Sequence, residues 1–159
     1  MKIKIQPLLI ISFFIMFTSN TFSQEDNSSD KQLNNNAIYG NAGIGGLWFT
    51  ATGYYERMLK QSMSGKRISS FARAGYGGLA AWEVETGYFL AQVGILTGLK
   101  THHFEISMGP IYYTNWGGIS GFSVSGNIGW RIQKPESPFL FRMGLGFPEA
   151  LFIGFGFSF

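Results

Sequence analysis

Cysteine is absent from this chain of 159 residues, and its absence excludes several classes of function. A chain without thiols has no disulfide framework, no cysteine nucleophile and no thiolate-bound metal ion. Charged side chains are scarce too, because Asp, Glu, Lys and Arg account for only 13% of the residues. No glycine-rich stretch is followed by the Gly-Lys-Ser/Thr ending of a phosphate-binding loop. We therefore expect neither a cofactor nor a metal site.

Long hydrophobic runs are also missing, apart from a single one that covers Leu8 to Phe17. It is too short for a membrane-spanning helix, which needs about 20 apolar residues. Lys2 and Lys4 precede the run, and small or polar residues follow it as far as Ser23. Because this order is typical of a secretory signal peptide, we predict one over residues 1–23, with an N-terminal membrane anchor as the alternative. No cysteine follows the run, which excludes a lipoprotein anchor.

The rest of the chain carries little net charge. Without Lys2 and Lys4, 10 of the 12 basic side chains remain against 9 acidic ones, so a nucleic-acid partner is not expected. Residues 24–36 are polar and rich in Asn and Ser, a composition that predicts a disordered leader. Residues 37–159 hold the four Trp and the many glycines, and we expect them to form one domain.

The stretch from Leu151 to Phe159 alternates between two kinds of side chain. One face of a strand would carry Leu151, Ile153, Phe155, Phe157 and Phe159, and the other Phe152, Gly154, Gly156 and Ser158. A membrane β-strand needs such an apolar face toward lipid and a small or polar face toward the lumen. The stretch also resembles the C-terminal assembly signal of outer-membrane β-barrels, in which Phe155, Phe157 and Phe159 would be the aromatic positions.

Similar alternation, interrupted by turn residues, recurs along the domain. We predict eight strands at about 37–45, 48–59, 67–79, 84–96, 101–114, 119–132, 138–147 and 150–159. This number and length predict an all-β fold, an eight-stranded antiparallel transmembrane up-and-down β-barrel. The alternative is a soluble barrel with an apolar lumen, but the large apolar groups of the last strand would overfill such a small interior.

An even number of strands places both ends of the barrel domain on one side, which is the periplasm in outer-membrane barrels. The opposite, outer hairpins then lie near Gly46, Ala81, Trp116 and Pro148, and Glu149 is expected among their charged turn residues. Three of the four tryptophans, Trp48, Trp82 and Trp116, fall at these hairpins. Tryptophan is enriched where a membrane meets water, so their position supports the strand count.

Alternation turns five charged side chains toward the lumen: Glu56, Arg73, Glu105, Arg131 and Arg142. Charges in a narrow barrel must be paired, because an unpaired buried charge costs several kcal/mol. We interpret the set as a structural network of ion pairs, with a gated pore or ligand path as the alternative. Three Arg against two Glu leave one positive charge to be compensated.

A second set, in the stretch Lys100 to Ser107, offers the only candidates for catalysis. His103, Glu105 and Ser107 share the inward face and His102 the outward one, so the two His cannot bind one metal ion together. Small barrels include lipid A deacylases and palmitoyltransferases that use such residues. Their site opens toward the outer leaflet, whereas these His are expected near the inner rim, and their His and Ser are closer in sequence. We therefore expect ordinary interior residues here.

Taken together, the chain resembles the small eight-stranded outer-membrane barrels of OmpA/OmpX type, and more closely a group of uncharacterised exported barrel proteins. The shared stretches are Gly53 to Leu59, Ala91 to Gly94, His102 to Glu105, Gln133 to Pro135 and Gly146 to Ala150. The resemblance implies a multi-pass protein of the cell outer membrane, exported through the signal peptide. Its partners would be outer-membrane lipid, lipopolysaccharide and the barrel-assembly machinery.

We expect this protein to be a monomer with a structural or envelope role and no catalytic activity. The outer hairpins are very short, which argues against an adhesin. Two alternatives remain open. One is a lipid-modifying enzyme, a lipid A acyl hydrolase or transferase, and the other is a narrow channel for small solutes.

Overall fold

The fold of the described chain, taken from a computed structural model, consists of strands joined by short turns. The structure describes residues 32–61, 68–82, 84–98, 100–116, 119–135 and 137–159. The strands are β1 (Asn36–Ile44), β2 (Trp48–Lys60), β3 (Ile68–Ala81), β4 (Val84–Thr97), β5 (His102–Trp116), β6 (Ile119–Gln133), β7 (Phe139–Phe147) and β8 (Ala150–Ser158). The predicted signal peptide, residues 1–23, lies outside the described residues, as does most of the predicted leader.

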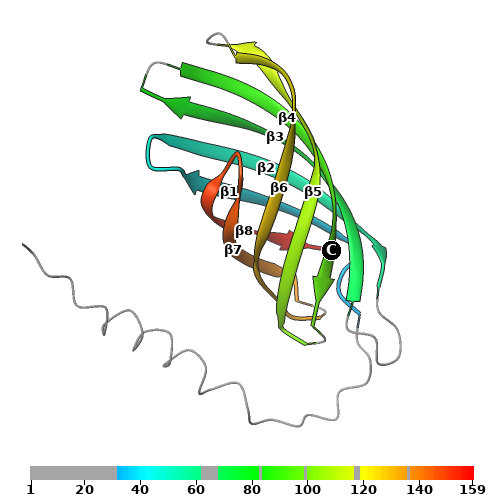
Figure 1. Ribbon diagram of the computed structural model, residues 1–159. Coiled ribbons are helices and arrows are strands. Elements are labelled where there is room, and N and C mark those ends of the chain that lie inside the picture. Colours follow the sequence, from blue (N-terminus) through cyan, green and yellow to red (C-terminus); the bar gives the residue numbers. More distant parts are fainter. Residues whose placement is uncertain (1–31, 62–67, 83, 99, 117–118, 136) are drawn as a thin grey trace, which may run out of the picture.

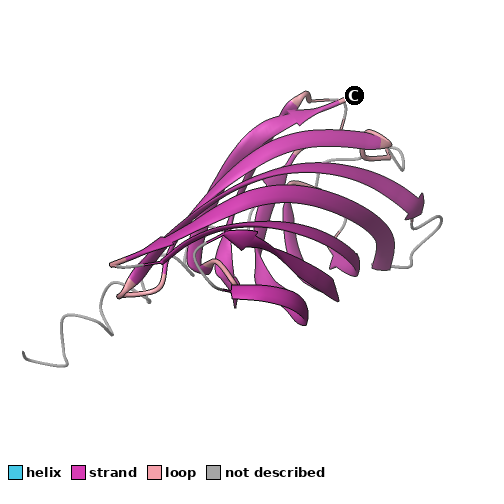
Figure 2. Ribbon diagram, turned by 90° about the horizontal axis from the view of Figure 1, so that it is seen from above, coloured by secondary structure: helices cyan, strands magenta, loops and turns pink. Residues whose placement is uncertain are grey.

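The eight strands form a closed antiparallel barrel in which each strand pairs with its neighbours in the sequence (Figure 1). β8 closes the barrel on β1, with Gly40 opposite Phe155 and Ile44 opposite Leu151. Seen from above, the strands make a single curved wall with no second layer over it (Figure 2). The fold class predicted from the sequence is therefore confirmed. Within the described ranges no helix is long and apolar enough to cross a membrane.

The alternation of side chains in the sequence decides which face of the wall they occupy. In β8, Leu151, Ile153, Phe155 and Phe157 are exposed on the outside, while Phe152 is buried inside. Large apolar side chains are also exposed on the outer faces of the remaining seven described strands, β1 to β7. The buried residues of the interior include charged and amide side chains. The alternative of a soluble barrel with an apolar lumen is therefore wrong.

The interior is filled along its length by side chains of different kinds. Met58, Phe71 and Leu96 form an apolar cluster close to the strand ends that lie beside the start of β1 and the end of β8. Tyr88 and Tyr113 pack edge to face on β4 and β5, nearer the opposite end, with ring centroids 5.9 Å apart. The charged side chains occupy the space between these aromatic and apolar groups.

The short segment before β1 is attached to the barrel. Leu33 packs against the apolar cluster of Met58, Phe71 and Leu96. The Asn34 side chain donates a hydrogen bond of 2.9 Å to the backbone oxygen of Ser158, and the Asn35 backbone oxygen accepts one of 2.8 Å from the Met58 amide. The contacts of the barrel thus begin a few residues before Ala37, and Leu33 covers one end of the lumen.

Candidate functional site: the barrel lumen

The lumen holds all five charged side chains that alternation turned inward, and Glu105 on β5 lies at their centre. Its carboxylate is fully buried and meets three guanidinium groups. The Arg142 Nη2 pairs with Glu105 Oε1, the Arg73 Nη1 lies 3.4 Å from the same oxygen, and the Arg131 Nη1 lies 3.9 Å from Oε2. One carboxylate therefore connects cations from β3, β6 and β7 across the interior.

Glu56 on β2 forms the second ion-pair centre. Its Oε1 pairs with the Arg131 Nη1 at 2.6 Å, and its Oε2 accepts a hydrogen bond of 2.8 Å from the Tyr39 hydroxyl. The Arg73 Nη1 donates in turn to the Tyr39 hydroxyl oxygen at 3.0 Å. Arg131 and Tyr39 therefore join the two carboxylates into one network, in which removal of any member affects several strands.

Arg142 is held differently from the other two arginines. Its Nε and Nη1 have no hydrogen-bond partner among the described residues. The guanidinium instead lies over the Tyr39 ring at 4.8 Å and the Phe152 ring at 4.9 Å. Ring faces attract a cation but do not neutralise its charge. Arg142 therefore depends on Glu105 for its charge compensation.

The residues considered for catalysis are not brought together. Ser107 accepts a hydrogen bond from Arg73 Nη2 and donates one of 3.2 Å to Gln92 Oε1, so it belongs to the charge network. His103 is buried, and its Nε2 lies 3.1 Å from the Gln133 backbone oxygen. Four residues along a strand separate His103 from Ser107 by roughly 13 Å, well beyond the reach of a nucleophile and its base.

The second histidine of this stretch lies on the opposite face of the wall from His103. His102 is exposed, as alternation predicts, and its Nδ1 accepts a hydrogen bond of 3.2 Å from the Trp130 indole on the outer wall. Among the described residues, no group of three or more His, Asp or Glu is arranged to hold a metal ion. The described part of the lumen thus offers an ion-pair network and no catalytic pair.

Glu149 is a further charged residue of the lumen, and the alternation of strand residues did not predict it. It occupies the turn between β7 and β8, as expected, but its side chain is fully buried. Its Oε1 accepts hydrogen bonds from Asn41 at 2.9 Å and Tyr54 at 3.1 Å, and its Oε2 accepts one of 2.6 Å from Asn127. Its position in the turn agrees with the sequence, but its burial could not be predicted, because strand alternation does not set the direction of a turn side chain.

The buried Glu149 carboxylate changes the charge balance of the interior. Among the described residues, the lumen with Glu149 holds three carboxylates and three guanidinium groups, so the excess positive charge expected from the sequence is compensated. A further hydrogen bond attaches this turn to β2: the Trp48 indole donates to the Pro148 backbone oxygen at 2.8 Å. These contacts hold the β7–β8 turn against the part of the lumen that lies opposite Leu33.

The three aromatic residues of the expected assembly signal lie on the other side of the wall. Phe155, Phe157 and Phe159 are exposed, and their rings contribute to the apolar outer face beside β1. They touch no member of the charge network. Any role in assembly would therefore be separable from the stability of the lumen.

The fold and the faces of the barrel define an outer-membrane type of β-barrel, with an apolar outer wall and a polar, charge-paired interior. The N-terminal β-barrel domain of OprF from Pseudomonas aeruginosa, known from its crystal structure, is similar with a TM-score of 0.58 and 13% sequence identity. The likeness covers 81% of this chain and 100% of that domain, and it shows a shared fold. No protein-family model and no curated protein sequence matches the chain.

Proposed function

We propose that the protein is a monomeric structural component of the outer membrane that is exported through the signal peptide and has no catalytic activity. The observation that supports this most directly is the filled lumen. Glu149 and its three partners occupy one end, the ion pairs around Glu105 the middle, and Leu33 with its cluster the other end. Because side chains that pair with one another fill the described part of the lumen, the interior favours a structural role over a path for solutes.

The apolar outer wall supports the proposal that the barrel is surrounded by lipid, namely phospholipid and lipopolysaccharide. Exposed aromatic and aliphatic side chains on all eight strands would be unfavourable in water, whereas in a membrane they meet acyl chains. The barrel-assembly machinery is the second proposed partner, through Phe155, Phe157 and Phe159.

The proposal is tested with the purified protein and with cells that lack it. In planar lipid bilayers we expect no conductance steps from the wild-type protein. In cells, we expect its loss to raise sensitivity to detergents while the acyl pattern of lipid A, measured by mass spectrometry, stays unchanged. Reproducible conductance would replace the structural role by a channel. An altered acyl pattern that is also lost in a His103→Ala variant would establish a lipid-modifying enzyme.

A further inference from the structure

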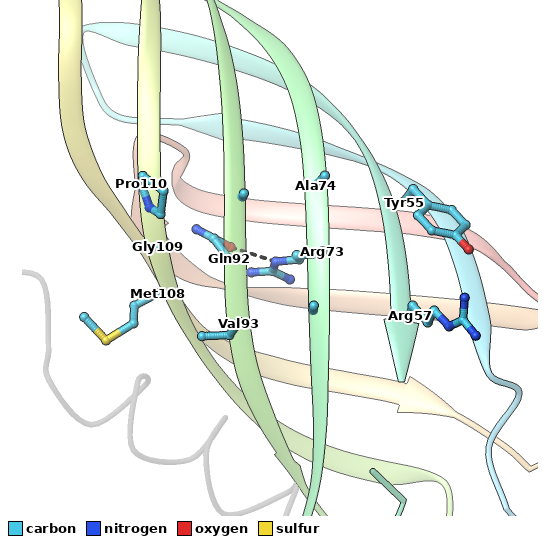
Figure 3. Close-up of a pocket in the computed structure, with 11 residues that line it drawn as sticks. Tyr55, Arg57, Arg73, Ala74, Gln92, Val93, Met108, Gly109 and Pro110 are labelled. Carbon is cyan, nitrogen blue, oxygen red and sulfur yellow. Dashed lines mark hydrogen bonds between the residues drawn. The ribbon is translucent and has the colours of Figure 1, made fainter. Parts of the chain in front are cut away.

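The outer wall carries a groove that the proposed function does not use. It has a volume of about 410 Å³ and crosses β2 to β5 on the lipid-facing side. Ala72, Ala74 and Ala91 form its floor, because their side chains are too short to fill the space between larger neighbours. Tyr55 and Arg57 lie on one side of it and Met108 on the other (Figure 3).

The strand register fixes how these residues are ordered across the wall. Tyr55 pairs with Ala74, and Ala74 with Ala91, in one row. Arg57 pairs with Ala72, which pairs with Val93, in the row beside it, and Val93 pairs with Met108. Neighbouring strands are about 4.8 Å apart, so the rows span roughly 14 Å from β2 to β5. The groove is therefore an extended trough of small apolar residues with a cation at one end.

Arg57 is the unusual member of this surface. Its side chain points outward from β2, and this side chain forms no ion pair or hydrogen bond within the described part of the chain. Its position near the end of β2 puts it close to the rim that carries both ends of the barrel. A cation on a lipid-facing wall is unfavourable unless it reaches the interface and finds an anion there. The described residues supply no anion to Arg57, so the phosphate of a membrane lipid is the complementary group that this surface favours.

We propose that the groove binds one glycerophospholipid, with its phosphate on the Arg57 guanidinium and an acyl chain along Ala72, Ala74 and Ala91. The inference rests on the proposed membrane location and adds a specific lipid site to it. Both ends of the barrel lie at this rim, so the lipid belongs to the leaflet on the side of the termini. A single guanidinium matches one phosphate, which favours a phospholipid over the two phosphates of lipid A.

The experiment measures lipid binding to the folded barrel. Wild-type protein in mild detergent is titrated with phosphatidylglycerol and the bound lipid is counted by native mass spectrometry. We expect one lipid to bind, with affinity reduced about tenfold in Arg57→Gln, because a charge-assisted contact is lost. Ala74→Leu should weaken binding as well, since the larger side chain fills the floor of the groove. Lys134→Gln and Ala42→Leu are the matched controls, because each makes the same kind of change on an exposed residue outside the groove.

Each outcome separates this inference from the proposed function. Heat-modifiable gel migration reports on the folded barrel, and a wild-type protein without it would overturn the proposed function itself. If all variants fold but Arg57→Gln and Ala74→Leu bind phosphatidylglycerol as tightly as the controls, the lipid site is refuted while the barrel stands. Preferential capture of lipid A, or a dimer mass that disappears in Ala74→Leu, would also refute it by assigning the groove to another occupant.

Discussion

Replacement of Glu105 by Gln tests the charge network at the carboxylate that contacts the most guanidinium groups. The substitution keeps the shape of the side chain and removes its negative charge. Arg131 retains Glu56 at 2.6 Å, and Arg73 retains Gln92 at 2.7 Å as well as Tyr39 and Ser107. Among the residues that the structure describes, Arg142 has no other anionic partner. The change therefore leaves one buried guanidinium without charge compensation.

The expected loss follows from that geometry. Removal of one partner of a buried ion pair costs about 3–5 kcal/mol, and the remaining contacts of Arg73 and Arg131 put Glu105→Gln near the lower limit, at about 3 kcal/mol. With the usual dependence of stability on urea, this lowers the unfolding midpoint by about 1–3 M. Arg142→Met alone should cost less, about 2 kcal/mol, because Glu105 keeps Arg73 at 3.4 Å.

The double variant Glu105→Gln with Arg142→Met provides the sharper test. It removes the carboxylate together with the cation that depends on it, so we expect it to be no less stable than Glu105→Gln alone. The two effects then fail to add by about 2 kcal/mol. Urea unfolding in lipid vesicles, followed by tryptophan fluorescence, measures all three variants, and Glu85→Gln on the exposed part of β4 is the control. Additive effects, or a wild-type midpoint for Glu105→Gln, would refute the account of the network.

Three further predictions concern the turn, the outer face and the closing strands. Glu149→Ala leaves the Asn41, Asn127 and Tyr54 side chains without their acceptor. Hydrogen exchange at the β7–β8 turn should become faster without loss of folding, and unchanged exchange would mean that these bonds do not hold the turn. Phe159→Ala should lower the amount of protein in the membrane of cells but not refolding in vitro, because its backbone bonds to Asn36 remain; normal amounts would mean that the signal is not used. Gly156→Val should prevent closure, because a Cβ there collides with the Ile38 backbone oxygen and Tyr39, and intact heat-modifiable migration would contradict this.

The strands could be predicted from the sequence because the barrel obeys a single rule of alternation. Each predicted strand agrees with an observed one, and the fifth, for instance, was expected over 101–114 and is found at His102–Trp116. The same rule requires Glu56 and Arg57 to lie on opposite faces, and in the structure Glu56 is buried inside while Arg57 is exposed outside. It works because a thin wall has two faces, and a shift of one residue would turn the whole strand inside out.

The rule gives the face of a side chain but not its partners. Glu56 and Arg131 are separated by 75 residues and meet only because of the stagger of the strands around the barrel. The rule does not apply to Glu149, because this residue lies in a turn where successive side chains no longer point to alternate faces. Leu33 was assigned to the polar leader because a single apolar residue among Asn and Gln gives no periodic signal. These three features nevertheless determine how the lumen is filled.

The filled lumen also explains why the sequence predicts the fold so much better than the function. The interior polar groups are used in contacts with one another, so their pattern encodes stability and leaves few groups for a partner. What remains available is the outer wall, where the composition is set by lipid and varies little from one barrel to another. Arg57 departs from that composition, because it is a cation on an apolar face whose side chain has no partner in the described part of the chain. Specific recognition by this barrel is therefore more accessible to experiment at Arg57 than at any of the buried charges.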